Sequence, residues 1–177
     1  MNPWPMLIVF LLPWTTLLAQ DSEPAGSTPA VAVAAACSAE EYRQFDFWAG
    51  EWNVTSAGQP AGTNNIQPVH NGCALQENWQ GAGAGGITGS SFNIYDRTTG
   101  QWHQTWVDSS GTLLQIDGGM VDGSMVMSGN IRSVDGNSTT HRISWTPNDD
   151  GTVRQLWEAS GDGHTWSVLF DGLYTRQ

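Results

Sequence analysis

The sequence predicts an all-β protein: a single antiparallel up-and-down β-barrel of about eight to ten strands with a short N-terminal helix. Composition is the first reason, because 21 Gly, ten Trp and a charged fraction of 13% in 177 residues describe a chain rich in turns and aromatic residues. The second reason is the regular recurrence of Asp-Gly and related turn signals. The third is that the segments between these turns, about 6 to 12 residues long, are rich in Val, Ile, Thr, Trp and Tyr.

Residues 1–19 predict a secretory signal peptide, because an apolar run over residues 4–18 is followed by Ala19 and then by polar residues. The run is shorter than the roughly 20 residues that a membrane-spanning helix needs, and Pro13 interrupts it. We therefore expect cleavage after Ala19, export to the periplasm or the medium, and no membrane insertion after cleavage. Residues 20–36 carry Pro, Ala, Ser and acidic residues without a strand or helix period, so we expect a disordered leader.

The folded domain is expected over residues 37–177. It opens with a short helix over residues 39–45, for which Ser38 and Glu41 have the spacing of a capping box. An open sheet of the strands that follow would leave exposed edges, and closure into a barrel removes them, although a β-sandwich is the alternative. The strands are expected near residues 46–56, 62–70, 73–80, 88–96, 100–107, 112–117, 120–130, 138–147, 152–159 and 165–176.

Cys37 and Cys73 are the only cysteines of the chain. An even number of cysteines in an exported protein favours a disulfide, and only one pairing within the chain exists. An unpaired state and a reactive thiol are the alternatives. The sequence has no Cys-x-x-Cys and no His-Glu-x-x-His pattern, so we expect neither a metal site nor a cofactor.

The charge balance narrows the classes of partner. The chain has six basic residues, all of them Arg, against 17 acidic ones, which gives a formal net charge of −11. Nucleic acids and anionic membranes bind clusters of Lys and Arg, so neither is an expected partner. The absence of Lys also excludes Schiff-base chemistry and a P-loop. We expect a monomer or a weak dimer.

The first and last expected strands carry a resemblance to a known family. Gly50-x-Trp52, within FDFWAGEW at residues 45–52, looks like the Gly-x-Trp signature of lipocalins and other calycins. The blocks FDFWAGEWNV, CALQENW, NIYDRTTGQWHQTWVDSSGTLL, RISWTPNDDGTVRQLWE and DGHTWSVLFDGLYTR together resemble a family of small secreted bacterial proteins with calycin-like barrels, at or near the domain-of-unknown-function 1579 family. The resemblance covers residues 37–177. It implies a barrel in which Arg176 stacks over Trp52 and closes one end, and it implies no established activity.

Alternation along the strands predicts which side chains line the lumen, because successive side chains of a strand face opposite sides. On residues 73–80 the apolar set includes Glu77, which is therefore expected inside. On residues 100–107 the face that carries Trp is favoured as inward, and the inward face of residues 138–147 stays undecided. The expected ligand-binding residues are four aromatic and three polar side chains, namely Glu77, Trp79, Tyr95, Gln104, Trp106, Gln155 and Trp157.

Three functions are compatible with such a barrel. The favoured one is an exported protein that binds a small, partly apolar or aromatic molecule in its lumen, since sites of this kind combine apolar walls with a few polar groups. The alternative is an enzyme, an isomerase, cyclase or hydrolase, with Glu77 as acid or base and with Arg142 or His103 as helper. The third is an interaction module of the cell envelope, in which Trp residues fill a solid core and Glu77 pairs with Arg142.

Overall fold

The structure is a computed structural model that describes residues 37–132 and 135–177. The predicted signal peptide and leader, residues 1–19 and 20–36, lie outside the described residues. Three 3-10 helices are present, η1 (Glu40–Arg43), η2 (Asp46–Trp48) and η3 (His70–Gly72). The strands are β1 (Gly50–Ser56), β2 (Gln59–Val69), β3 (Ala74–Gly81), β4 (Thr88–Asp96), β5 (Gln101–Asp108), β6 (Leu113–Val121), β7 (Ser124–Arg132), β8 (Ser138–Pro147), β9 (Val153–Ser160) and β10 (Ser167–Arg176).

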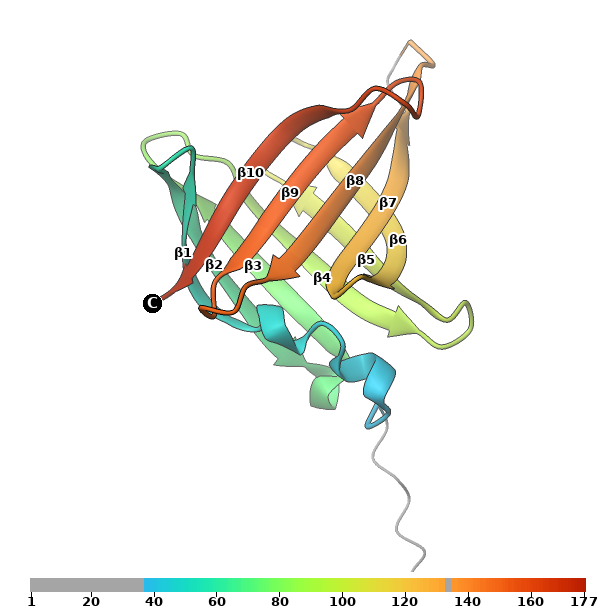
Figure 1. The fold of residues 1–177 in the computed structure, drawn as a ribbon. Helices are drawn as coiled ribbons and strands as arrows, with labels where there is room; N and C mark the ends of the chain where they lie inside the picture. Colours follow the sequence, from blue (N-terminus) through green and yellow to red (C-terminus); the bar gives the residue numbers. More distant parts are fainter. Residues whose placement is uncertain (1–36, 133–134) are drawn as a thin grey trace, which may run out of the picture. The chain divides into compact units, whose positions relative to one another are not determined.

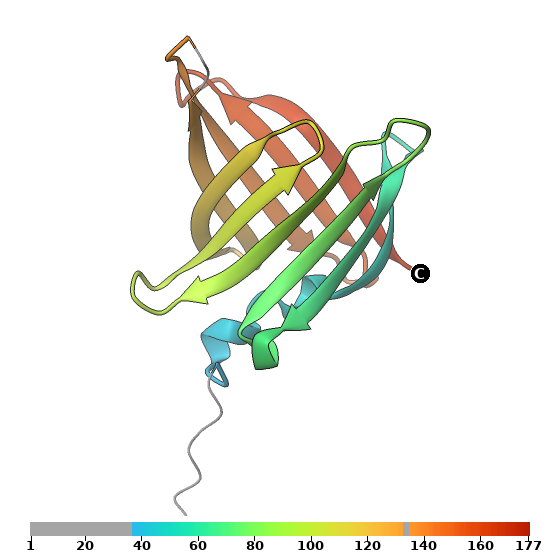
Figure 2. The same cartoon turned by 180° about the vertical axis from the view of Figure 1, so that it is seen from behind.

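The ten strands close into one antiparallel barrel, which confirms the predicted fold class and excludes the β-sandwich (Figure 1). Each strand pairs with its neighbours in the sequence, and β1 pairs with β10 to complete the ring. The wall opposite β8–β10 is formed by β3–β6, which lie side by side in Figure 2. Because the ring is closed, every strand has two hydrogen-bonded neighbours and no sheet edge is left open.

One predicted turn is wrong. The expected strands over residues 112–117 and 120–130 place a turn at Gly118-Gly119, but these residues lie inside β6, and the hairpin turn follows at Asp122-Gly123. The reason is packing, because a side chain at Gly118 would meet the main-chain carbonyl of Val126 on the neighbouring strand. Gly is required here by the close approach of two backbones rather than by a turn.

The single helix predicted over residues 39–45 is not formed. The chain forms the two short 3-10 segments η1 and η2 instead, and no side chain caps η1, so the expected capping box of Ser38 and Glu41 is absent. Phe45 and Trp48 are both fully buried, and their rings stack with centroids 4.9 Å apart. The segment therefore follows the packing of its aromatic side chains under the barrel rather than a regular helical repeat.

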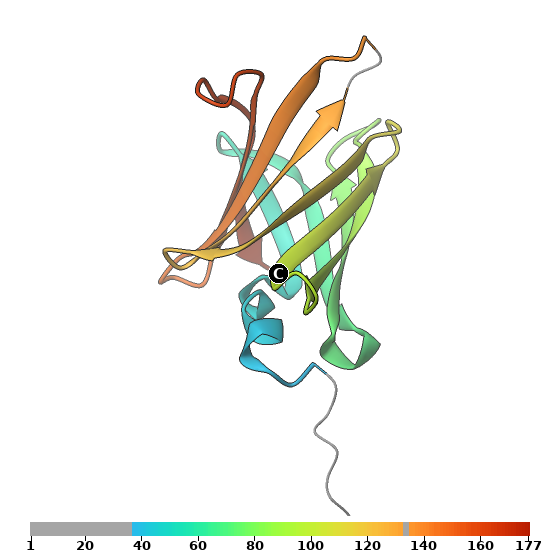
Figure 3. The same cartoon turned by 90° about the vertical axis from the view of Figure 1, so that its right-hand side faces the viewer.

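The helical segments lie across one end of the barrel, which Figure 3 shows from the side. Below the barrel wall, Trp48 contacts Trp145 and Tyr174, with ring centroids 5.4 and 6.4 Å apart. The guanidinium of Arg176 lies 4.3 Å from the centre of the Trp52 ring and donates a hydrogen bond to the carbonyl of Ala49. This end of the barrel is filled with buried aromatic side chains.

Gly50 makes the contact between Arg176 and Trp52 geometrically possible. A side chain at Gly50 would collide with the Arg176 guanidinium, and the backbone φ of 142° at Gly50 is one that other residues rarely adopt. The indole of Trp52 donates a hydrogen bond to the carbonyl of Trp48, 2.9 Å away, which fixes the ring beneath the cation. Gly at position 50 and Trp at position 52 thus belong to one packing arrangement with the last strand.

The disulfide between Cys37 and Cys73 is present, as predicted. It joins Cys37, three residues before η1, to Cys73, the residue before β3, over a sequence separation of 36. Arg43, at the end of η1, adds a hydrogen bond to the carbonyl of Gly72. The closed end is therefore attached to the barrel wall by a covalent bond as well as by packing.

Replacing both cysteines, Cys37→Ser together with Cys73→Ser, should lower the free energy of unfolding by about 4 kcal/mol, because the unfolded chain loses a closed loop. Urea unfolding followed by Trp fluorescence measures the change. A reducing agent should lower the stability of the wild type by a similar amount and leave the double variant unchanged. Equal stability of the oxidised wild type and the double variant would contradict this account.

Candidate functional site

Three strands repeat one pattern on their inward faces: an apolar residue, a polar residue and then Trp. The pattern is Leu75, Glu77 and Trp79 on β3, Trp102, Gln104 and Trp106 on β5, and Val153, Gln155 and Trp157 on β9. Neighbouring strands of the barrel run in opposite directions, so the odd-numbered strands β3, β5 and β9 run in the same direction. The repeat therefore produces three layers across the lumen: an apolar floor, a polar middle and an upper ring of Trp.

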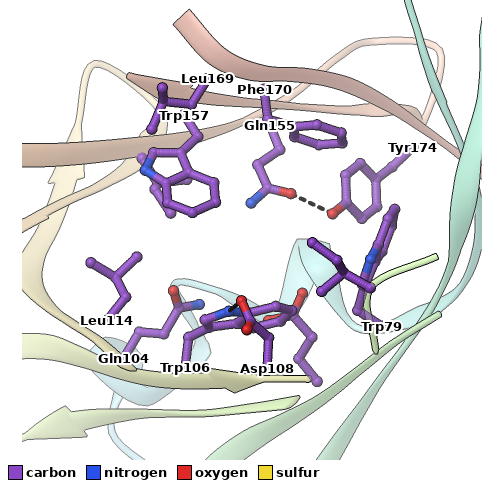
Figure 4. Close-up of a pocket in the computed structure, with 13 residues that line it drawn as sticks. Trp79, Gln104, Trp106, Asp108, Leu114, Gln155, Trp157, Leu169, Phe170 and Tyr174 are labelled. Carbon is purple, nitrogen blue, oxygen red and sulfur yellow. Dashed lines mark hydrogen bonds between the residues drawn. The ribbon is translucent and has the colours of Figure 1, made fainter. Parts of the chain in front are cut away.

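A cavity of about 240 Å³ lies above the polar layer. Side chains from β3, β5, β6, β8, β9 and β10 surround it, as Figure 4 shows for most of them. Its wall includes Glu77, Trp79, Ile87, Gln104, Trp106, Asp108, Leu114, Ile143, Gln155, Trp157, Leu169, Phe170 and Tyr174. The lumen is thus filled at the helical end and open in its other half.

Glu77 is the buried charge-bearing group of this cavity, with only 4% of its surface exposed. Its two carboxyl oxygens accept hydrogen bonds from different neutral donors: Oε1 from the Asn64 amide at 2.7 Å and Oε2 from the Ser91 hydroxyl at 2.6 Å. Glu77 takes part in none of the ion pairs between described residues. The carboxyl is therefore held in place by dipoles, without a counter-charge.

The donors of Glu77 belong to a chain of directed hydrogen bonds. On one side Gln104 donates to Asn93 Oδ1 at 2.7 Å, and Asn93 donates to Ser91 Oγ at 2.9 Å. On the other side the Asn64 amide also donates to the Tyr174 hydroxyl at 3.3 Å, and Tyr174 donates to Gln155 Oε1. While Glu77 accepts both hydrogen bonds, each amide is held in one orientation by its neighbours.

At each end of this series of hydrogen bonds, one side-chain amide atom has no partner among the described residues. Neither Gln104 Oε1 nor Gln155 Nε2 makes a hydrogen bond to any described residue. Figure 4 shows both side chains reaching into the cavity, with the Gln155 oxygen turned to Tyr174. The cavity therefore presents one free acceptor and one free donor group beside the Glu77 carboxyl.

Burial raises the pKa of Glu77 from 4.5 to about 7, against the smaller opposing effect of the hydrogen bonds from Ser91 and Asn64. Because no cation offsets the loss of hydration, the acid is poised between its two forms near neutral pH. A protonated Glu77 needs an acceptor, and Asn64 Oδ1 is buried without a partner in the described structure. Rotation of the Asn64 amide would bring that oxygen to the acid.

Two Trp rings of the upper layer are fixed by hydrogen bonds from their indole nitrogens. Trp106 donates to Asp108 Oδ2 at 3.1 Å, and Trp157 donates to His141 Nδ1 at 3.0 Å. Burial raises the pKa of Asp108, but hydrogen bonds from Ser110, Trp106 and Thr112 outweigh it and lower the pKa to about 2. Burial also lowers the pKa of His141, which favours the neutral imidazole that accepts the Trp157 bond.

Glycines on neighbouring strands leave the space in which the wall aromatics lie. A side chain at Gly89 would overlap the Trp106 ring, and one at Gly62 would overlap the Trp79 ring. A side chain at Gly172 would overlap the ring of Phe170, two residues earlier on the same strand. The rings lie against bare backbone instead of extending across the lumen, which keeps the cavity open.

Six of the seven expected ligand-binding residues, all except Tyr95, line the cavity. Tyr95 lies at the helical end, where its ring contacts Tyr42 and Trp102 at centroid distances of 5.4 and 6.4 Å. It is separated from the cavity because it is at the end of β4 near the 3-10 helices, two positions beyond Asn93.

The two expected catalytic helpers of Glu77 are not near it. Arg142 pairs with Glu158 at 2.9 Å and lies over the Trp166 ring, on the outer side of β8, whose inward residues are His141, Ile143 and Trp145. His103 pairs with the exposed Asp117 at 2.7 Å, also on the outer face. Strand alternation explains both positions, and a Glu77–Arg142 ion pair is therefore excluded.

Sequence reasoning missed the neutral partners of Glu77, Asn64 and Ser91, and the residues bonded to them in turn, Asn93 and Tyr174. Ser91 and Asn93 could have been found, because alternation on β4 places them on the same face as Tyr95. Asn64 and Tyr174 depend on the register of β2 and on closure between β1 and β10, which no local pattern specifies.

No protein-family model matches the chain, and no curated protein matches it significantly. Among residues 37–132 and 135–177, no group of three or more His, Cys, Asp or Glu side chains could hold a metal ion. In the same part of the chain, no helix has the length and apolar character needed to cross a membrane.

The raised pKa of Glu77 predicts how stability depends on pH. Because the folded protein holds this proton more tightly than the unfolded chain, the contribution is complete below about pH 4.5 and is lost as the pH rises through about 7. The loss in free energy of unfolding is about 3 kcal/mol. Glu77→Gln should remove this pH dependence and be the more stable protein at about pH 8.

Urea unfolding of the wild type, Glu77→Gln and Glu158→Gln at about pH 5 and pH 8 measures the effect. Glu158→Gln is the matched control, since it removes the same charge from the outer face of β9. Equal changes with pH in the wild type and in Glu77→Gln would show that Glu77 is not the responsible group.

Proposed function

We propose that this barrel is an exported protein that binds a small, partly apolar or aromatic molecule in its lumen. The observation that carries the proposal is the cavity itself, whose wall of Trp rings includes the two unsatisfied amide atoms of Gln104 and Gln155. Both atoms face the open cavity, where a bound molecule can form hydrogen bonds with them. The disulfide supports export, since such bonds persist in oxidising compartments.

The cavity counts against the envelope module with a filled core, because about 240 Å³ between the side chains above Glu77 is left unfilled. The resemblance of the FDFWAGEW segment to calycins agrees with lumen binding, and we propose that family for the chain. The contact of Gly50, Trp52 and Arg176 supports this membership, since it closes one barrel end.

Native mass spectrometry of the mature protein, purified from the periplasm or the medium, tests the proposal. A retained small molecule, accompanied by quenching of Trp fluorescence when it is added back to stripped protein, is the expected result. A protein that is empty and unresponsive to aromatic and lipid probes would overturn the proposal.

The substitution Gly89→Ala should weaken binding at least about tenfold, because its methyl group pushes the Trp106 ring into the cavity. Quenching titrations with the retained molecule measure the change. Gly119→Ala is the matched control, since open space surrounds that position on the barrel wall. Unchanged affinity in Gly89→Ala would show that the ligand lies elsewhere.

An enzyme is the second candidate, and the specific observation in its favour is the Glu77 carboxyl with a pKa of about 7. General acids and bases work best with a pKa near the operating pH. A screen of small neutral esters and ketones should then reveal turnover that titrates near pH 7, is lost in Glu77→Gln and persists in Glu158→Gln. Turnover that survives in Glu77→Gln would exclude this mechanism.

A further inference from the structure

We infer that the molecule bound in the lumen is an organic cation: a protonated amine on a small aromatic or apolar body, with its ammonium group beside Glu77. This inference rests on the proposed function and specifies its ligand. It depends on three independent features of the cavity, which are the sign of its charges, the unpaired carboxyl and the aromatic wall.

The charged side chains of the cavity wall are both acidic, Glu77 in the polar layer and Asp108 at the upper rim. No Arg is part of the wall, and the chain contains no Lys. Four Arg residues make contacts elsewhere: Arg43 with Asp46 at the helical end, Arg142 and Arg154 with acids on the outer face, and Arg176 with Trp52. With a net charge of −11, the protein attracts cations and repels anions.

The Glu77 carboxyl has the hydrogen-bond donors that hold it in place but lacks a counter-ion. Asn64 and Ser91 each supply one neutral donor, and each carboxyl oxygen can accept further bonds. An ammonium group would supply both the missing charge and new donors, in a site where little water weakens the attraction. Gln104 Oε1, the free acceptor of the same layer, would take another ammonium hydrogen.

The Trp wall suits a cation with an aromatic body. Indole rings attract cations more strongly than other aromatic side chains do, and the rings of Trp79, Trp106 and Trp157 border the cavity. The molecule already uses Trp in this way, since Arg142 lies 4.0 Å from the Trp166 ring centre and Arg176 lies 4.3 Å from that of Trp52. A cavity of about 240 Å³ is smaller than a typical drug-sized site, so it fits one ring with a short chain.

Three probes with the same body and different charge test the inference: 2-phenylethylamine, 2-phenylethanol and phenylacetate. Titration into the mature protein at about pH 8, followed by Trp fluorescence and calorimetry, should show the amine bound at least about tenfold more tightly than the alcohol, and phenylacetate most weakly. Glu77→Gln should bring the amine to the affinity of the alcohol. Glu158→Gln, which removes an acid from the outer face, should keep the preference for the amine.

The affinity for 2-phenylethylamine should also rise about tenfold from about pH 6 to about pH 8, because the amine binds the ionised form of Glu77. Two other titratable groups around the site keep one form over this interval, since burial and the charge of Glu77 hold the pKa of Tyr174 far above it and Asp108 has a pKa of about 2. Burial lowers the pKa of His141, which favours its neutral form. The alcohol should show no such rise.

The outcomes separate this inference from the proposed function. Tighter binding of 2-phenylethanol or phenylacetate than of the amine would overturn the inference that the ligand is a cation. It would leave the proposal of binding in the lumen intact. If none of the three binds, the charge of the molecule retained in native mass spectrometry decides, and a neutral or anionic molecule overturns the inference. Absence of both a retained molecule and probe binding would overturn the proposed function together with it.

Discussion

The structure depends on one constraint: ten strands closed into a ring enclose more interior than ordinary side chains can fill. At one end the chain meets the constraint with its largest residues, as Phe45, Trp48, Trp52 and Trp145 are all fully buried. In the other half the Trp rings lie against glycines on neighbouring strands, and space remains. The same residue type therefore closes the barrel at one end and lines a cavity at the other.

The polar layer between these halves is where stability and binding oppose each other. A buried carboxyl without a cation costs stability, and the two donors from Asn64 and Ser91 offset only part of that cost. On the outer face, by contrast, acids do have cationic partners: Arg142 and Arg154 each pair with an acid that is partly exposed to water. With the cations outside and the unpaired acid inside, the carboxyl without a counter-charge lies in the wall of the cavity, where a small molecule can reach it.

Much of the barrel could be predicted from the sequence, because the period of two and the Asp-Gly turns are local features. The inward positions of Glu77, Gln104 and Gln155 follow from the apolar and Trp residues on either side of them. The Gly118-Gly119 pair misled this reasoning, because close approach of β7 and a hairpin turn both select Gly. Arg142 and His103 were ambiguous for another reason, since each lies on a strand with polar residues on both faces.

The partners of Glu77 were beyond local reasoning, because they come from strands far apart in the sequence. Asn64 and Tyr174 are 110 residues apart and meet only because β1, which lies between β2 and β10 in the ring, brings the two ends of the chain together. A local pattern can place a residue on a face, but register and closure decide which residues of that face become neighbours.

The disulfide at the helical end has a kinetic consequence. The helical end of the barrel is filled by aromatic rings and is covalently attached to β3. The cavity is therefore closed on that side, and we expect solutes to enter and leave through the opposite end, the mouth of the cavity. Residues 82–86, a Gly-rich segment between β3 and β4, lie at that mouth next to Ile87 of the cavity wall. A substitution there that changes only passage through the mouth would alter the rates of arrival and departure by the same factor, so it would change the residence time of a ligand and leave its equilibrium occupancy unchanged.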